Sequence, residues 1–205
     1  MIPHKSLFTA SFLLAVVLAV PHQVRAGQPM EFMQQKVKAV LTVLAEPKTD
    51  SGGTRRIERL RSLSQEIFDF IELSRRTLGR HWNRLTKEQR KEFTFLFSRL
   101  LEKTYLDRIQ EYSKERVEFN DEILFTEKRA EVKTSIVQSS KRIPISYRLL
   151  KKEKGWRVYD VQVEGVSLVK NYRTQFASIL SRNAPEKLLQ MMRDKVQVGI
   201  QADGE

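Results

Sequence analysis

The amino-acid sequence predicts an α+β domain in which a curved antiparallel meander of four strands packs against N-terminal and C-terminal helices. Apolar residues recur at three- and four-residue spacing before residue 112 and after residue 167, which is the period of amphipathic helices. Between Arg116 and Gly165 the period becomes two, as in strands. The turns there are too short for the crossovers of a parallel sheet, so we expect an antiparallel sheet that curls around the helices.

Two helices are expected at the start of the domain. The first covers residues 30–46, and a loop with paired glycines at 47–54 ends it. The second is expected over residues 55–71, because its apolar residues keep the spacing of one helix face. The apolar stripe of the first helix consists of Phe32, Val37, Val40, Leu41 and Leu44.

A short helix and then the longest helix are expected next. Ser74 is expected to cap the short helix, which ends near Gly79. Thr86 and Gln89 predict a capping box, in which each side chain accepts a bond from a backbone amide of the other residue. The long helix behind this box is expected to reach about Tyr112. Its bulky apolar face consists of Phe93, Leu96, Phe97, Leu100, Leu101, Tyr105 and Ile109.

The meander is expected to contain four strands. Pro144 indicates an edge position or a bulge in the third strand, because proline has no amide hydrogen for the ladder. The turn at residues 151–155 leads into the fourth strand. The strands are expected from 117, over 130–136, over 142–150 and from Trp156 to the glycine at 165.

Two helices close the domain, over residues 167–180 and 186–196. Pro185 suits the first turn of the second of these helices, where a missing amide hydrogen costs nothing. The residues beyond 196 show no pattern. No internal repeat and no second domain is evident, so residues 27–205 are expected to form one domain.

Residues 1–26 have the pattern of a cleavable signal peptide. A weakly basic start is followed by an uncharged, mostly apolar run from Leu7 to Val20, and small residues precede the expected cleavage site after Ala26. The alternative is a transmembrane anchor, but the run is shorter than the roughly 20 residues that a span needs. The chain has no cysteine, so stability is expected to come from its core. Export without disulfides indicates the periplasm.

The charge of the chain is strongly basic. Removing Lys5 and Arg25 from the +12 of the whole chain leaves +10 for residues 27–205. The export signal argues against nucleic acid as the partner. Basic residues are instead expected on solvated helix faces, or against anionic lipid head groups or an acidic protein surface.

Residues for catalysis are sparse. His81 is the only histidine after residue 26, so most nucleophile–base arrangements lack their usual members. No phosphate loop, dinucleotide fingerprint or HExxH motif is present. Asp160 is expected to face an arginine or a backbone amide. We therefore expect that the chain is not an enzyme and that it binds no cofactor and no metal.

The fourth strand raises a question about its two faces. Strict alternation places Trp156 and Val158 on one face but Tyr159, Val161 and Val163 on the other. A strand with one wet face alternates cleanly between apolar and polar residues. The sequence therefore predicts an apolar cover on each face of this strand.

Two long segments carry a family resemblance. Residues 68–105 contain SRRTLGRHW, and residues 143–176 contain IPISY and GWRVYDVQVEGVSLVKNYRTQF, in this order. These motifs resemble those of the MlaC family of periplasmic phospholipid-binding proteins, also known as the toluene-tolerance or ABC-transporter auxiliary family. The resemblance implies a fold similar to nuclear transport factor 2, with acyl chains held between sheet and helices.

The resemblance also implies function and partners. The chain is expected to shuttle phospholipid between an outer-membrane lipoprotein complex and the substrate-binding subunit of an inner-membrane ABC transporter. The lipid is then the expected cover for the second face of the fourth strand. Two alternatives stay open, namely a carrier of another apolar lipid such as a hopanoid and an interaction module that binds no lipid.

The residues expected at these sites come from the long helix, the later strands and the C-terminal helix. The long helix is expected to face the third and fourth strands across a lipid slot, which the C-terminal side closes. Three arginines are expected to dock onto the partners. The expected lipid-binding residues are Phe93, Phe97, Leu100, Tyr105, Tyr147, Trp156, Val158, Val161, Val166, Leu168, Tyr172 and Phe176, and the docking residues are Arg76, Arg80 and Arg84.

Overall fold

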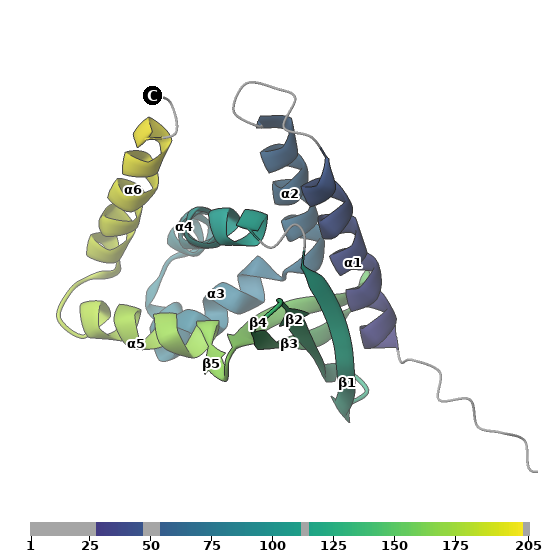
Figure 1. Cartoon of the computed structure of the whole chain (residues 1–205). Coiled ribbons are helices and arrows are strands. Elements are labelled where there is room, and N and C mark those ends of the chain that lie inside the picture. The colour runs from purple at the N-terminus through teal and green to yellow at the C-terminus, as the bar shows by residue number, and fades with distance from the viewer. Residues whose placement is uncertain (1–27, 47–53, 112–114, 203–205) are drawn as a thin grey trace, which may run out of the picture.

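A five-stranded antiparallel sheet and two groups of helices make up the structure, a computed structural model that describes residues 28–46, 54–111 and 115–202 (Figure 1). The strand order follows the chain. The elements are α1 (Gln28–Ala45), α2 (Thr54–Ile67), α3 (Phe70–Leu78), the 3-10 helix η2 (Gly79–Arg84), α4 (Lys87–Glu111), β1 (Arg116–Thr126), β2 (Arg129–Val137), β3 (Arg142–Lys152), β4 (Gly155–Val163), β5 (Val166–Ser167), α5 (Leu168–Leu180) and α6 (Pro185–Ala202).

The predicted α+β class and the antiparallel meander are confirmed, with one addition. A two-residue strand, β5, follows β4 through a tight turn. Glu164 and Gly165, the two turn residues, both have positive φ, at 50° and 82°. This is the backbone pattern of the hairpin turn that matches strand twist.

One face of the sheet packs on helices and the other is polar. Helices α1 and α2 lie against the inner face, on which Ala130, Val132, Leu149 and Val158 are buried (Figure 1). The outer face carries ion pairs between neighbouring strands, including Lys133–Asp121 at 3.3 Å and Arg148–Glu131 at 3.3 Å.

A β-bulge in β4 explains its double apolar pattern. Arg148 of β3 pairs with Asp160, but the next residue, Leu149, pairs with Val158, so Tyr159 is extra. The extra residue reverses the alternation. Val161 and Val163 therefore share the inner face with Trp156 and Val158, and the expectation of a second apolar face covered by lipid is wrong.

Tyr159 in the bulge and the neighbouring Asp160 contact residues of the helices and of β5. The guanidinium of Arg76 lies 4.0 Å from the ring centroid of Tyr159. Asp160 accepts hydrogen bonds from the Ser167 hydroxyl at 2.7 Å and from the Val169 amide at 3.1 Å, which fixes the start of α5. The predicted backbone-amide partner of Asp160 is thus confirmed.

The boundary between the second and the short third helix comes earlier than predicted, because α2 ends at Ile67 and α3 begins at Phe70. The helical conformation is interrupted at Phe68, which forms an isolated parallel β-bridge with Val158. The Asp69 amide donates a hydrogen bond to the Val158 carbonyl at 2.9 Å. Asp69 then caps α3 by accepting from the Glu72 amide at 2.9 Å. The prediction that Ser74 caps this helix is wrong, since Ser74 is buried inside α3.

The predicted capping box is confirmed. Thr86 and Gln89 form the reciprocal capping box, with amide-to-side-chain distances of 3.1 and 3.2 Å. Pro144 lies one residue beyond the last β3–β4 pair, Ile145 with Val163. Its carbonyl accepts a hydrogen bond from the Glu164 amide at 3.0 Å. Helix α6 extends to Ala202, beyond the predicted end at 196.

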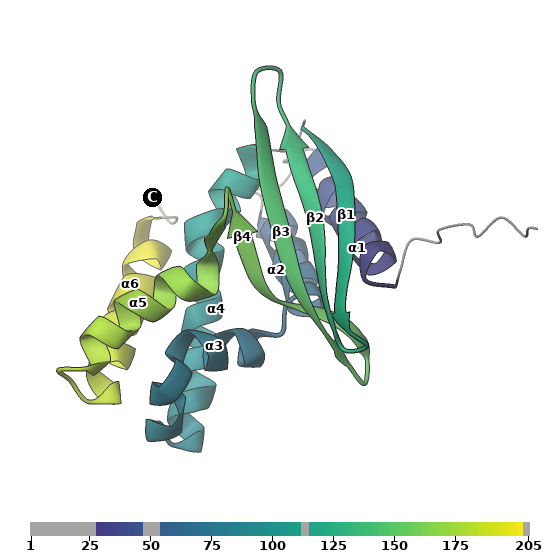
Figure 2. The ribbon, with the colours of Figure 1, turned by 90° about the horizontal axis from the view of Figure 1, so that it is seen from below.

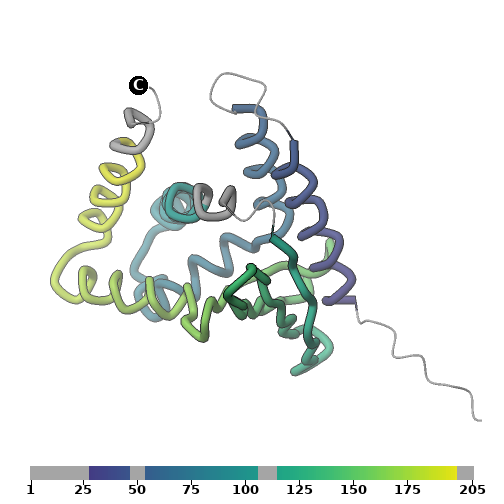
Figure 3. Tube along the Cα trace, viewed as in Figure 1, coloured from purple at the N-terminus to yellow at the C-terminus, as the bar shows by residue number. Residues whose placement is uncertain are grey.

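The buried residues form two main clusters rather than one. The sheet cluster joins the inner face to α1 and α2, and the helical cluster joins α3, α4, α5 and α6. Helix α4 packs chiefly on α6 and α3, as Figures 2 and 3 also show. Phe68, at the α2–α3 break, packs against both clusters.

Candidate functional site

A groove opens between α1 and the first part of β1. Its volume is about 450 Å³, within the ~300–1,000 Å³ range of small-molecule pockets. β1 is an edge strand, so the groove lies at the open border of the inner face. Its lining residues are Gln34, Val37, Lys38, Leu41, Thr42, Ala45, Glu115, Val117 and Phe119.

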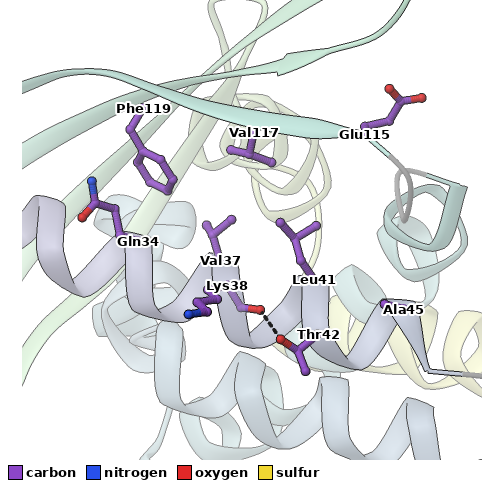
Figure 4. A pocket seen from close by; sticks show the side chains of 9 residues that line it. All are labelled: Gln34, Val37, Lys38, Leu41, Thr42, Ala45, Glu115, Val117 and Phe119. Carbon is purple, nitrogen blue, oxygen red and sulfur yellow. Dashed lines mark hydrogen bonds between the residues drawn. The ribbon is translucent and has the colours of Figure 1, made fainter.

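Four apolar side chains converge inside the groove. Figure 4 shows Val37 and Leu41 pointing from α1 toward the strand, and Val117 and Phe119 pointing from the strand toward α1. All four are only partly buried. They follow from sequence periodicity, because residues four apart share a helix face and residues two apart share a strand face.

The floor of the groove continues into the sheet core. Val37 and Phe119 pack against the sheet cluster, which also contains Tyr147 and Val161 among its half-buried members. Burial raises the pKa of the Tyr147 phenol, and its hydrogen bond with Thr134 offsets part of that rise. The phenol is therefore neutral in the physiological range, which suits an apolar surrounding.

The rim of the groove is polar. Lys38 and Gln34 are exposed on α1, and Glu115 lies just before β1. The Thr42 hydroxyl is satisfied within its helix, since it donates to the Lys38 carbonyl at 2.9 Å (Figure 4). An apolar interior with a polar rim suits an amphipathic ligand whose head stays in water.

A second cavity of about 340 Å³ lies on the other side of α1, against α2. Its lining is more polar, with Arg59, Ser62 and Glu66 among its residues. Lys36 and Glu66 pair across the two helices at 2.5 Å. The α1–β1 groove is therefore the better site for an apolar ligand.

The fold and this groove can be compared with known proteins. The model of the family described as MlaC protein matches residues 34–194, most of the chain. The chain belongs to the MlaC protein family.

The chain is also similar to one curated protein and to one solved structure. The intermembrane phospholipid transport system binding protein MlaC of Haemophilus influenzae is 23% identical over 195 residues, which cover 89% of each chain. The phospholipid-binding protein from Ralstonia solanacearum, solved in complex with a phospholipid, matches with a TM-score of 0.77 at 22% identity. That match covers 85% of this chain and 99% of the other, and it confirms the α+β fold.

The predicted slot residues fall into separate parts of the MlaC fold. Tyr147, Trp156, Val158 and Val161 belong to the sheet cluster. Val166 belongs to neither cluster and is 63% exposed on the β4–β5 hairpin, whereas the remaining predicted slot residues belong to the helical cluster. The helical-cluster members are Phe93, Phe97, Leu100, Tyr105, Leu168, Tyr172 and Phe176.

The prediction that these two sets face each other is therefore wrong. The long helix packs on α3 and α6, and its aromatic face meets Tyr172 and Phe176 of α5, with ring centroids 5.1 Å apart for Phe97–Tyr172 and 5.6 Å for Phe93–Phe176. Val166 lies in the two-residue strand β5, where it pairs with Val163 of β4. The lipid-binding role of the individual residues stays a prediction.

Two of the three predicted docking arginines have partners inside the fold. Arg76 donates to Glu72 at 2.7 Å besides stacking on Tyr159. Burial raises the pKa of Glu72, but its bonds to Arg75 and Arg76 outweigh that effect and lower it overall. Arg84 donates to the Leu180 carbonyl at 2.9 Å, while Arg80 is exposed. Their docking role stays a prediction.

His81 lies away from the groove, buried in η2. Burial, followed by the charges of Arg80 and Arg84, lowers the pKa of its imidazole. The Arg84 guanidinium lies 3.2 Å from its Nδ1, which suits a neutral ring that accepts a bond. Within the described ranges, no group of three His, Asp or Glu side chains is placed to hold a metal.

The sequence pattern missed the α1–β1 groove as a site. Val37 and Leu41 lie on the expected apolar stripe of the first helix, and Val117 and Phe119 lie at the start of the first expected strand. The pairing of these residues across the groove has no local signal, because the helix and the strand are distant in sequence. The available signal was position in the sheet. The first strand of a meander is an edge, and the inner border of an edge strand is open to a ligand.

Proposed function

We propose that this chain carries phospholipid through the periplasm between the inner and outer membranes, with acyl chain held in the α1–β1 groove. The observation that carries the proposal is the apolar groove with a polar rim, continuous with the sheet core. The name of the Haemophilus relative and the phospholipid in the Ralstonia structure support this cargo.

The energetics favour a protein carrier for such cargo. Burying an acyl chain is worth roughly 0.8 kcal/mol per methylene, so an unaided lipid seldom crosses water. Val37, Leu41, Val117 and Phe119 provide apolar contact for a chain, and the Tyr147 and Val161 side of the core extends it inward. The head group stays at the Lys38 and Gln34 rim, from which it can be handed on.

The cargo can be tested on protein purified from a periplasmic fraction. Mass spectrometry of an organic extract is expected to show stoichiometric diacyl phospholipid. A polycyclic lipid in its place would keep the carrier and change the cargo. A folded protein without lipid would contradict the proposal.

A filler variant tests the place of the cargo. Leu41→Trp enlarges a half-buried side chain of the groove and is expected to leave the fold intact while it reduces bound lipid. The matched control is Ile71→Trp, at a position on α3 that is 65% exposed. Equal lipid in both variants would place the acyl chain elsewhere.

Docking is proposed onto acidic surfaces of an inner-membrane substrate-binding subunit and an outer-membrane lipoprotein. The positive charge of residues 27–205 supports long-range attraction. Arg80→Glu, with the exposed Arg182→Glu as control, is expected to slow association with the inner-membrane subunit more at low salt than at high salt. Association rates unchanged by mutation and salt would contradict this docking.

A further inference from the structure

Two hairpin turns lie together at one end of the sheet. In an antiparallel meander the β1–β2 and β3–β4 turns share one end, and the β2–β3 turn lies at the other (Figure 2). The two turns are joined by a hydrogen bond from the Lys151 amide to the Lys128 carbonyl at 2.9 Å. They therefore present one continuous surface, here called the hairpin tip, made of residues 124–129 and 151–154.

The hairpin tip exposes two adjacent apolar side chains. Leu124 is 58% exposed and Phe125 is 53% exposed. The register between β1 and β2 shifts between Leu124 and Thr126, so Phe125 falls outside the regular pairing. A single exposed apolar residue is ordinary. A Leu–Phe pair on a projecting turn gains free energy by entering an apolar phase.

Basic residues surround this apolar pair. Lys128, Arg129, Lys151 and Lys154 are exposed, and in the described part of the chain none of them forms an ion pair. Lys152 is held by Asp69 at 2.9 Å and is not available. Glu127 and Glu153 are the two acidic residues of the hairpin tip, so positive charge exceeds negative charge there.

We propose that the hairpin tip docks this carrier onto an anionic lipid bilayer. Basic residues attract an anionic leaflet, and Phe and Leu enter the boundary between head groups and acyl chains. An acidic protein surface fits less well, because lysine is depleted at protein interfaces, and all but one of these basic residues are lysine.

Docking through the hairpin tip leaves the groove free. The groove is lined by Val117 and Phe119 near the start of β1, and Phe125 lies near its end. At about 3.3 Å per strand residue, the two sites are roughly 20–25 Å apart. Membrane docking by the hairpin tip therefore does not depend on what the groove binds. The docking proposal and the lipid-carrier proposal can be contradicted separately.

The experiment is cosedimentation of the purified full chain with vesicles. One set contains phosphatidylcholine and phosphatidylglycerol in equal parts, and the other contains phosphatidylcholine alone. The wild-type protein is expected to sediment with the anionic vesicles, and high salt is expected to release it. No sedimentation with anionic vesicles would overturn the proposal.

Two double variants test the two components of the hairpin tip. Lys128→Glu with Lys154→Glu is expected to weaken partition to anionic vesicles about tenfold or more. Leu124→Ser with Phe125→Ser is expected to weaken it while the salt dependence stays. The charge-matched control is Lys170→Glu with Lys187→Glu, at exposed positions of α5 and α6. The apolar control is Val166→Ser.

The variants must keep their fold and their cargo, measured by circular dichroism and lipid content. Folded tip variants with normal lipid and weak vesicle binding support the proposal. Equal vesicle binding by the tip and control variants would overturn it. Unchanged vesicle binding with lost binding to the partner complexes would show that the hairpin tip meets a protein instead.

Discussion

Val158 and Val161 are three residues apart on β4, yet both side chains lie on the inner face of the sheet. The bulge at Tyr159 makes this possible, because Val158 is opposite Leu149 and Val161 is opposite Tyr147, which is on the same face. Val158 is fully buried and Val161 half-buried. The apolar side chains on both sides of the bulge thus contribute to one core.

Threonine substitution tests the shared face. Threonine matches valine in size, but it places a hydroxyl in the core, which costs about 1–3 kcal/mol when unpaired. Val158→Thr is expected to lower the free energy of unfolding in urea by that amount, and Val161→Thr by less. Val163→Thr, at a position that is 41% exposed, is the control. A neutral Val161→Thr would indicate that Val161 faces water.

The carboxylate of Asp160 is expected to stabilise the junction of β4 and α5. Asp160→Ala removes the acceptor for the Ser167 hydroxyl and the Val169 amide, so about 1–3 kcal/mol of stability is expected to be lost. The control Asp121→Ala removes an exposed ion pair with Lys133, worth at most about 1 kcal/mol. Equal loss in the two variants, measured by urea unfolding, would contradict the capping role.

The stability of the fold is expected to depend on pH through His81. Burial lowers the folded-state pKa of this imidazole below its ordinary value near 6.5. The unfolded chain therefore binds the proton first, and stability falls as the pH drops through about 6.5 toward the folded pKa. The slope is at most about 1.4 kcal/mol per pH unit for one proton.

His81→Gln is expected to remove this slope as the pH falls below 7, whatever the effect of the substitution on stability at pH 7. Urea unfolding at several pH values measures it. The control Asn83→Gln changes an exposed neighbour in η2 and keeps the imidazole. A slope that persists in His81→Gln would assign it to another group.

Most of the fold could be predicted from the sequence because its signals are local. The capping box at Thr86 and Gln89 and the change of apolar period at Arg116 each depend on a few neighbouring residues. The break at Phe68 could not be predicted in this way. It exists because Phe68 and Asp69 bond to Val158, which is distant in the chain.

The same limit explains the misplaced slot. Strict alternation assigned Val158 and Val161 to opposite faces, because a bulge of one residue has no mark in the apolar pattern. The aromatic face of α4 predicted burial correctly but not its partner. Phe97 packs on Tyr172 of α5. This contact depends on the position at which α5 starts, which Asp160 of β4 fixes by accepting a hydrogen bond from the Val169 amide. Residue types thus predicted which side chains are buried, whereas hydrogen bonds between residues distant in the chain determine which side chains they contact.

The helical cluster can be tested directly as a lipid wall. Phe97 is fully buried and contacts Phe93, Tyr172 and Phe176. Phe97→Ala is expected to cost about 3–5 kcal/mol of stability through the cavity it leaves. Leu100→Trp is expected to cost about 1–3 kcal/mol by overpacking. Urea unfolding measures both losses, and mass spectrometry of the folded fraction is expected to show lipid at the wild-type level. Full stability with reduced lipid in either variant would instead make the helical cluster part of the acyl-chain site, as the sequence first predicted.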